Sequence, residues 1–235
     1  MVVIQDLYKK FGKNQVLGGV DLKITEPGIF AVLGPNGSGK TTLIKSILGM
    51  VIPDKGEITV LEKNIKRNSA YRYQIDYLPQ IANFPSNLRV KELIKMIKDL
   101  RGNTSNDQKL IALFKLEPFL DKKLGNLSGG TKQKVNIVLT FMFDSPLIIL
   151  DEPTTGLDPI ALIRLKELIK DSKENGKTIL ITSHIMSFVE EISDEIVFLL
   201  EGEIYFKGSI LELKTKTNQE DFEHAIASIL IENHV

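Results

Sequence analysis

A glycine-rich loop between an apolar run and a helical segment is the strongest constraint in this sequence. The loop occupies residues 34–42 and fits the pattern G-x-x-x-x-G-K-[ST]. Residues 29–33 before it are all apolar, and the apolar positions within residues 43–48 after it lie on one helical face. From average residue frequencies, the pattern alone arises by accident in on the order of one in a hundred chains of this length. A strand before it and a helix after it therefore favour a phosphate-binding loop over a simple glycine turn at a strand end.

Each residue type in the loop serves a separate chemical purpose. Glycine permits a positive φ and lets backbone N–H groups approach phosphate oxygens closely. Lys40 supplies a positive charge for the β and γ phosphates, Thr41 offers a hydroxyl to Mg²⁺, and Thr42 is placed for an α-phosphate contact. The helix that follows points the positive end of its dipole at the same phosphates. The predicted nucleotide-binding residues of the loop are Gly34, Pro35, Asn36, Gly37, Ser38, Gly39, Lys40, Thr41 and Thr42.

Composition indicates a soluble globular protein without a strong charge bias. The 235 residues are 43% hydrophobic and 26% charged, and 30 basic residues balance 30 acidic ones. The protein therefore has no net charge that would attract nucleic acid or an anionic membrane. The absence of cysteine excludes disulfides and thiolate chemistry. The longest apolar runs are shorter than the roughly 20 residues that span a bilayer. Charged residues also stand near the N-terminus, where a signal peptide would need its apolar core. We expect a cytoplasmic chain that reaches a membrane only through a partner.

Strand-like alternation at the N-terminus predicts a small antiparallel sheet. Residues 1–26 alternate around a turn at residues 11–14, and residues 56–60 form a further short strand. Phe11 lies at the turn, where its ring is free to stack on a purine. Taken alone, an aromatic residue beside a turn is more often a packing residue.

The middle of the chain changes to a helical pattern. Between residues 82 and 143, apolar positions recur at helical spacing, as in residues 90–97, with a polar interruption at residues 102–108. Nothing in this stretch is catalytic by itself. We expect a helical subdomain inserted into an α/β core.

Two further apolar runs end in polar residues that suit catalysis. Residues 147–150 end in Asp151 and Glu152, and residues 178–182 end in Ser183 and His184. Continuous apolar strands separated by helices predict a parallel sheet that is covered on both faces. Ligand sites in such sheets lie beyond the carboxyl ends of the strands. The phosphate-binding loop, two carboxylates and an imidazole are therefore predicted to meet at one edge.

These edge residues have plausible roles in nucleotide hydrolysis, each with a simpler alternative. Asp151 is placed to hold Mg²⁺, and Glu152 to accept a proton from the attacking water, although an acidic pair after a strand is also found in solvated turns and helix caps. His184 could bond a γ-phosphate, but a lone histidine at a strand end is more often structural. Gln80 could ligate Mg²⁺ or orient water, yet a single glutamine carries little information.

Residues 127–134 (LSGGTKQK) resemble the signature motif of ABC-transporter ATPases. Ser128, Gly129 and Gly130 lie just ahead of a predicted helix, where a hydroxyl, N–H groups and the helix dipole can face an anion. The same residues also fit an ordinary capped helix. An ordinary capped helix, however, does not explain why this motif accompanies the phosphate-binding loop in one chain.

The resemblance covers nearly the whole chain, with the motifs in the family's order. Phe11 matches the adenine-stacking aromatic, Gln80 the Q-loop and His184 the switch histidine, while residues 147–152 match Walker B and residues 156–158 the D-loop. Thr131 and Gly156 depart from the residues that the family has most often, glutamine and serine. These two departures bear on the hydrolysis rate and on coupling between subunits.

The resemblance implies one ABC ATPase domain over residues 1–235. Its fold is α/β, a P-loop NTPase with a mostly parallel core sheet, an N-terminal antiparallel β subdomain and an inserted α-helical subdomain. The implied core covers residues 1–80 and 144–208, the helical subdomain with the signature motif covers residues 81–143, and a short helical tail covers residues 209–235. The sequence as a whole resembles the short, single-domain ATPases of exporter-like systems. This group includes the copper-maturation ATPase of nitrous-oxide reductase systems.

The resemblance also implies the partners and the cofactors. The cofactors are ATP and Mg²⁺, and Thr41, Gln80 and Asp151 are the implied metal ligands, beside Glu152, His184 and Gln80 as catalytic residues. A second copy pairs head to tail so that each signature faces the other copy's ATP. A separate transmembrane permease docks near residues 81–90, with Phe84 as an apolar contact, and holds the chain at the inner face of the cell membrane. No nucleic-acid partner is expected.

Three other functions compete with a transporter subunit. A soluble ABC ATPase of DNA maintenance shares the motifs, but inserts a long coiled coil where this chain has only a short stretch between Gln80 and Leu127. Translation-factor relatives carry two cassettes in one chain. A small-molecule kinase uses the same phosphate-binding loop but leaves the signature unexplained.

Overall fold

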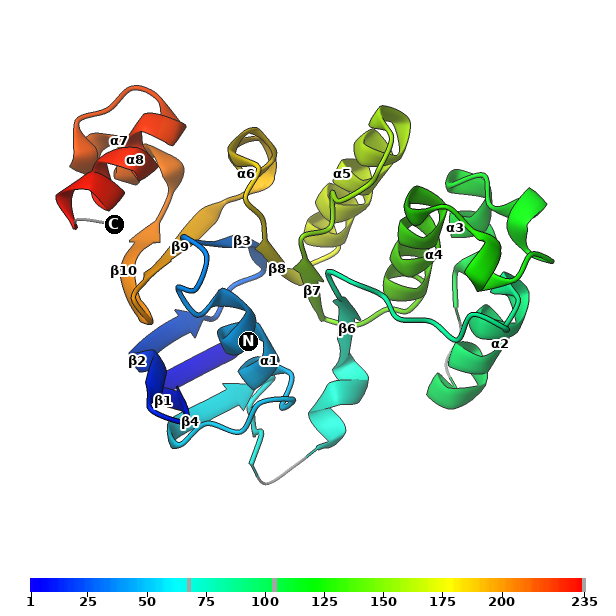
Figure 1. The fold of residues 1–235 in the computed structure, drawn as a ribbon, viewed down its shortest axis with the longest axis horizontal. Helices are drawn as coiled ribbons and strands as arrows, with labels where there is room; N and C mark the ends of the chain where they lie inside the picture. The colour runs from blue at the N-terminus through cyan, green and yellow to red at the C-terminus, as the bar shows by residue number, and fades with distance from the viewer. Residues whose placement is uncertain (67–68, 103–104, 234–235) are drawn as a thin grey trace.

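A six-stranded sheet forms the centre of the protein (Figure 1). The structure is a computed structural model that describes residues 1–66, 69–102 and 105–233. The strand order is β10-β9-β3-β8-β7-β6, and all neighbours are parallel except the β9–β10 hairpin. The mostly parallel core sheet is therefore confirmed. The strands are β3 (Gly28–Leu33), β6 (Ile75–Leu78), β7 (Leu147–Asp151), β8 (Thr178–Thr182), β9 (Glu195–Leu200) and β10 (Glu203–Gly208).

Every residue of β3, β7 and β8 is buried, because both faces of the sheet are covered. One face carries α1 (Lys40–Ile47) and the antiparallel sheet, which share one hydrophobic cluster with it. The other face carries helices that follow the signature and the later strands. These helices are α4 (Gly129–Phe141), α5 (Pro159–Glu174), α6 (Met186–Ile192), α7 (Ile210–Thr217) and α8 (Phe222–Glu232).

The N-terminal half contributes the antiparallel sheet that the alternation predicted. Its order is β2-β1-β4-β5, and all pairs in it are antiparallel. Figure 1 shows it beside α1, on the opposite side of the molecule from α3 and α4. The strands are β1 (Val2–Phe11), β2 (Asn14–Ile24), β4 (Lys55–Val60) and β5 (Lys63–Asn64).

A helical lobe is inserted between β6 and β7, as predicted. It contains α2 (Val90–Arg101), α3 (Asp107–Leu113) and α4, and it extends to one side of the sheet in Figure 1. Polar contacts tie it to the core: for example, Arg101 binds the buried Asp76 of β6 at 2.8 Å, and Arg164 of α5 donates to the carbonyl of Leu113. The subdomain boundaries stay a prediction, and the last two residues of the predicted tail lie outside the described part.

Across the three described ranges, no helix is both long enough and apolar enough to cross a membrane.

Candidate active site

The glycine-rich loop joins β3 to α1 in a backbone conformation that requires glycine. Gly34, Gly37 and Gly39 have φ values of +145°, +84° and +103°. A Cβ on Gly34 would lie 2.1 Å from the carbonyl oxygen of Leu199, so the loop must pass against β9 without a side chain. No acidic residue stands in the first turn of α1, so no carboxylate of the helix itself opposes the positive end of its dipole.

Lys40 is folded back along the loop. Its ammonium donates to the carbonyl oxygens of Gly34 at 2.7 Å and Pro35 at 2.9 Å. Burial lowers the pKa of Lys40, and the nearby charges of Glu152 and Asp151 oppose this effect. The charge of Lys40 is therefore held between the loop and the two carboxylates.

Residues from four separate parts of the chain line one small cavity. Its volume is about 140 Å³, and its lining contains the loop and the ends of β6, β7 and β8. This is the edge at which the apolar strands were expected to deliver their polar residues. The lining residues are Asn36, Gly37, Lys40, Thr41, Gln80, Asp151, Glu152 and Thr182.

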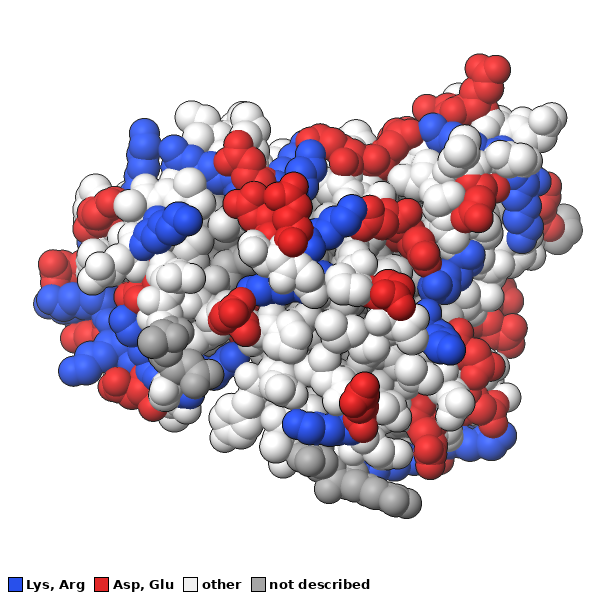
Figure 2. Space-filling view, turned by 180° about the vertical axis from the view of Figure 1, so that it is seen from behind, with Lys and Arg blue, Asp and Glu red and all other residues white. Residues whose placement is uncertain are grey.

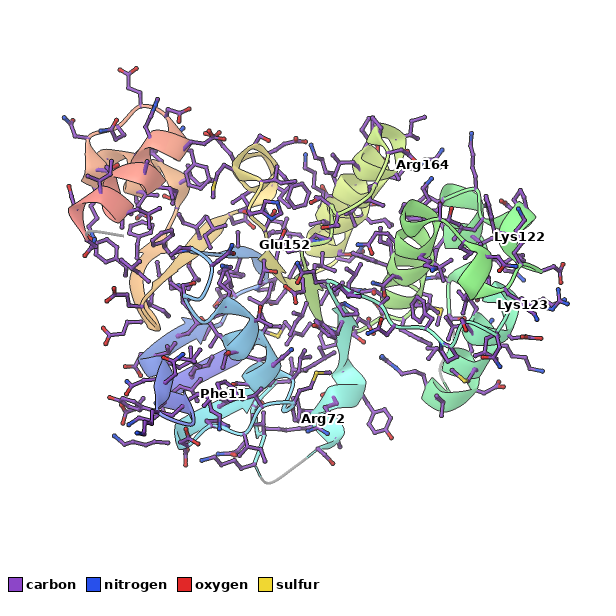
Figure 3. All side chains as sticks on the ribbon, in the orientation of Figure 1. Phe11, Arg72, Lys122, Lys123, Glu152 and Arg164 are labelled. Atoms are coloured by element: carbon purple, nitrogen blue, oxygen red, sulfur yellow. The ribbon has the colours of Figure 1, made fainter. Side chains whose placement is uncertain are left out.

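Asp151 and Glu152 are buried at this edge, with exposed fractions of 5% and 8%. Thr182 of the neighbouring strand donates its hydroxyl to Asp151 Oδ1 at 2.5 Å. The carboxylate of Glu152 lies 2.8 Å from Nδ1 of His184, so the structure brings this histidine to the site although it does not line the cavity. Figure 3 places Glu152 at the ends of the central strands, between the antiparallel sheet and the helical lobe.

Two site residues, Thr182 and Tyr77, were missed by sequence reasoning. Burial raises the pKa of Tyr77 to about 12, together with the charge of Asp151 and a hydrogen bond to it. Tyr77 belongs to β6 and Thr182 to β8, so Asp151 of β7 has a hydroxyl-bearing residue on each side. The only sequence signal was the position of Thr182 as the last residue of a buried strand.

The remaining residues of the loop and Phe11 do not line the cavity. Ser38 is buried, and its hydroxyl has no hydrogen-bond partner among the described residues. Gly34, Pro35, Gly39 and Thr42 are also absent from the lining. Phe11 is 52% exposed at the end of β1, and Lys9 Nζ lies 5.3 Å from its ring centroid. Figure 3 places Phe11 on the antiparallel sheet, apart from Glu152.

Residues 128–130 also lie outside the cavity, at the start of α4. The hydroxyl of Ser128 accepts from the N–H of Thr131 at 3.3 Å and caps the helix. A Cβ on Gly130 would lie 2.6 Å from the carbonyl oxygen of Gly156, so glycine is needed for this close approach. Lys134 of the same helix forms an ion pair at 2.6 Å with Asp158. The first turns of α4 are thus packed against the segment that follows Glu152.

Comparison with known proteins identifies the family. The family model described as "ABC transporter" matches residues 17–155, more than half of the chain. A Nod factor export ATP-binding protein I from a Rhizobium species is 34% identical over 207 residues, which cover 86% of this chain and 68% of that protein. The chain belongs to the ABC transporter ATP-binding family. The recognition made from the motif order is therefore confirmed.

Other similarities agree with this assignment. A lantibiotic transport ATP-binding protein, SrtF of Streptococcus pyogenes, is 34% identical over 213 residues, which cover 87% of this chain and 89% of that protein. A second family model, described as "AAA domain, putative AbiEii toxin, Type IV TA system", matches only residues 123–190.

Solved structures confirm the ABC ATPase fold. The structure of an ATP-binding subunit of an ABC transporter has a TM-score of 0.91 and 28% identity, and covers 97% of this chain and 98% of that chain. A dimeric ATP-binding cassette in a post-hydrolysis state with ADP and Pi has a TM-score of 0.80 and 25% identity, covering 89% and 98%. The protein is an ATP-binding and ATP-hydrolysing subunit of an ABC transporter.

We expect Lys40→Ala to weaken ATP binding by roughly ten-fold to a hundred-fold, the range for losing one hydrogen bond to a charged group. Lys45→Ala is the matched control, because Lys45 lies on the same helix with an exposed side chain. The measurement is the dissociation constant of a fluorescent ATP analogue. Equal affinities of the two variants would contradict the placement of the phosphates at this loop.

Proposed function

We propose that this subunit hydrolyses ATP with the residues around the shared cavity and transmits ATP-driven dimer closure to an exporter permease. The observation that supports this best is the meeting of Lys40, Asp151 and Glu152 in one cavity. The outward direction rests on the relative that is named for Nod factor export.

The cavity has the oxygen donors that suit Mg²⁺. The hydroxyl of Thr41, the amide of Gln80 and the carboxylate of Asp151 all line it. In the described ranges no group of three acidic, histidine or cysteine side chains forms a metal cluster. This fits Mg²⁺, which is usually held by one or two carboxylates together with the phosphates of its nucleotide. When bound, the ion would neutralise negative charge on the phosphates of the nucleotide.

Glu152 is the proposed general base. Its carboxylate accepts a proton from water, the water oxygen bonds to the γ-phosphorus, and the bond from this phosphorus to the β–γ bridging oxygen breaks. His184 holds the carboxylate from one side through the 2.8 Å contact. Lys40 and the loop N–H groups bind the phosphates, and Phe11 stacks on the adenine.

Residues 128–130 are proposed to complete the site of a second copy. They do not line the cavity of their own chain, although the capped start of α4 offers N–H groups and a helix dipole to an anion. A head-to-tail homodimer would place them on the partner's phosphates. The dimeric state of the similar cassette with ADP and Pi supports this arrangement.

The permease is proposed to dock beside residues 81–90. Ile81 is 73% exposed, and Phe84 lines a groove of about 460 Å³ between the core and the helical lobe. Met50, Ile97 and Leu139 give this groove apolar walls. Docking here would hold the chain at the inner face of the membrane.

No nucleic-acid partner is proposed. The net charge is zero, and basic and acidic side chains are interspersed on the face shown in Figure 2. A phosphate backbone requires a concentrated basic surface.

We expect Glu152→Gln to lower the ATP turnover number by about 10²–10⁴-fold, the usual contribution of a general base, while ATP still binds. Glu201→Gln is a matched control, since Glu201 has the same φ of 49° but lies exposed in the β9–β10 turn. Phosphate release and ATP affinity are measured for both. Turnover that is unchanged in Glu152→Gln would remove Glu152 as the base.

Ser128→Arg is expected to abolish ATP-dependent dimers, because it places bulk and positive charge in the partner's phosphate site. Light scattering after size-exclusion chromatography measures dimers with ATP in a Glu152→Gln background. Ser209→Arg controls for the loss of a helix cap and the added charge, because Ser209 caps α7 in the same way. Normal dimerisation of the Ser128 variant would exclude the composite site.

Purification of Glu152→Gln from native membranes with Mg-ATP is expected to recover a membrane protein with several spanning helices. Mass spectrometry identifies the proteins retained. The control is Glu152→Gln combined with Phe84→Ala, which removes an apolar side chain from the proposed docking groove and should retain less of the partner. Recovery of DNA-repair or ribosomal proteins alone would contradict the proposed coupling to a permease.

A further inference from the structure

The hydroxyl of Thr182 links the two carboxylate residues of the site in one hydrogen-bond chain. The N–H of Glu152 donates to Thr182 Oγ1 at 3.1 Å, and the same hydroxyl donates to Asp151 Oδ1 at 2.5 Å. The direction is fixed, because an ionised carboxylate only accepts. All three residues are buried, with exposed fractions of 8%, 1% and 5% for Glu152, Thr182 and Asp151. Bonds in such a chain strengthen one another where water is excluded.

The same strand contains an internal comparison. Thr178 is the first residue of β8 and is fully buried, but its hydroxyl has no hydrogen-bond partner in the described part of the chain. Threonine therefore occupies this strand at one end without using its hydroxyl, which is consistent with the preference of β-branched residues for strands. At the other end, the hydroxyl of Thr182 makes two bonds and lines the cavity. Strand propensity accounts for Thr178 but not for the bonds of Thr182.

The backbone of Glu152 needs the support that Thr182 gives. Glu152 has a φ of +49°, the left-handed region that side chains other than glycine seldom adopt. Its N–H donates both to the hydroxyl and to the carbonyl oxygen of Thr182, each at 3.1 Å. Both acceptors belong to one residue, so the turn after β7 is anchored to the end of β8. Loss of the hydroxyl would leave the Asp151 carboxylate with Tyr77 as its hydroxyl partner on one side only, and would weaken this anchor.

We propose that Thr182 is a positioning residue for ATP hydrolysis, whose hydroxyl fixes the carboxylate of Asp151 and the backbone of Glu152 relative to each other. This proposal rests on the roles proposed above for Asp151 toward Mg²⁺ and for Glu152 as the base. Thr182 itself does not act on the reacting atoms. Its effect reaches the nucleotide through the orientation of Asp151 and the geometry of Glu152.

Two consequences are expected when the hydroxyl is removed. A misoriented Asp151 would weaken the response of ATP binding to Mg²⁺ without changing binding in EDTA, where the loop and Lys40 act alone. A loosened Glu152 would lower the turnover number. An effect on packing alone would lower thermal stability and leave the Mg²⁺ response in place. The Mg²⁺ response therefore separates positioning from packing.

The experiment compares Thr182→Val, Thr182→Ser and Thr178→Val in the full chain. Valine preserves the shape of threonine and removes the hydroxyl, whereas serine keeps the hydroxyl. Each variant is measured for the affinity of a fluorescent ATP analogue in EDTA and in Mg²⁺, for turnover, and for melting temperature. If Thr182→Val does not fold, Thr182→Ala replaces it, since alanine removes the same hydroxyl without adding an apolar methyl group beside Asp151.

We expect Thr182→Val to lose most of the gain in affinity that Mg²⁺ provides and to lower turnover by roughly ten-fold to a hundred-fold, the range for a bond to a charged group. Thr182→Ser should recover most of both, and Thr178→Val should keep both. A normal Mg²⁺ response and turnover in Thr182→Val, or a folded Thr182→Ser that recovers neither, would overturn the proposal.

Glu152→Gln is measured in the same experiment to separate two kinds of failure. If Glu152→Gln hydrolyses ATP normally, the proposed role of Glu152 fails, and the role of Thr182 in turnover fails with it. If Glu152→Gln is inactive while Thr182→Val is normal in turnover and Mg²⁺ response, only the positioning role of Thr182 fails.

Discussion

The parallel pairing of β3, β8 and β7 is the interaction on which the site depends. In this register Thr182 pairs with Val32 on one side and with Asp151 on the other, so the three strands end at the same level. The phosphate-binding loop, the two carboxylates and His184 therefore begin from one edge. A slip of one residue would turn Asp151 to the opposite face. Burial on both faces fixes the register, because each strand contributes alternating side chains to two separate hydrophobic clusters.

The helical lobe contacts the same edge through α4. Asn136 donates to the carbonyl of Pro79, the residue before Gln80, at 3.3 Å. Gln133 is buried and donates to the carbonyl of Pro153, the residue after Glu152, at 3.0 Å. One helix thus holds the turns that follow β6 and β7. Because residues 128–130 begin this helix, a displacement that brings them to a second copy would also act on the turns that carry Gln80 and Glu152.

The sequence predicted those elements that are determined by residues adjacent to one another in the chain. Continuous apolar runs marked β3, β7 and β8, and glycine spacing marked the loop. The edge strand β6 was not predicted, because its buried Asp76 breaks the apolar run and is compensated by Arg101, which is distant in sequence. Thr182 was missed for a related reason: its bonds cross to β7, and threonine alone indicates only a strand. Phe11 lies at a turn as the sequence indicated and does not line the cavity, so its role in adenine stacking stays a prediction.

The strained backbone of Glu152 explains how two consecutive carboxylates serve one cavity. Successive side chains of a strand point to opposite faces, and Asp151 shares the face of Leu147 and Ile149, which pack toward α1. A regular continuation would turn Glu152 to the other face. The φ of +49° ends this alternation and lets both side chains line the cavity, at a cost of about 1–2 kcal/mol. Glu152 donates its N–H to Thr182 Oγ1, and its carboxylate contacts Nδ1 of His184. A hydrogen bond contributes about 1 kcal/mol, so these two contacts together offset the cost of the strained backbone and hold this geometry before ATP arrives.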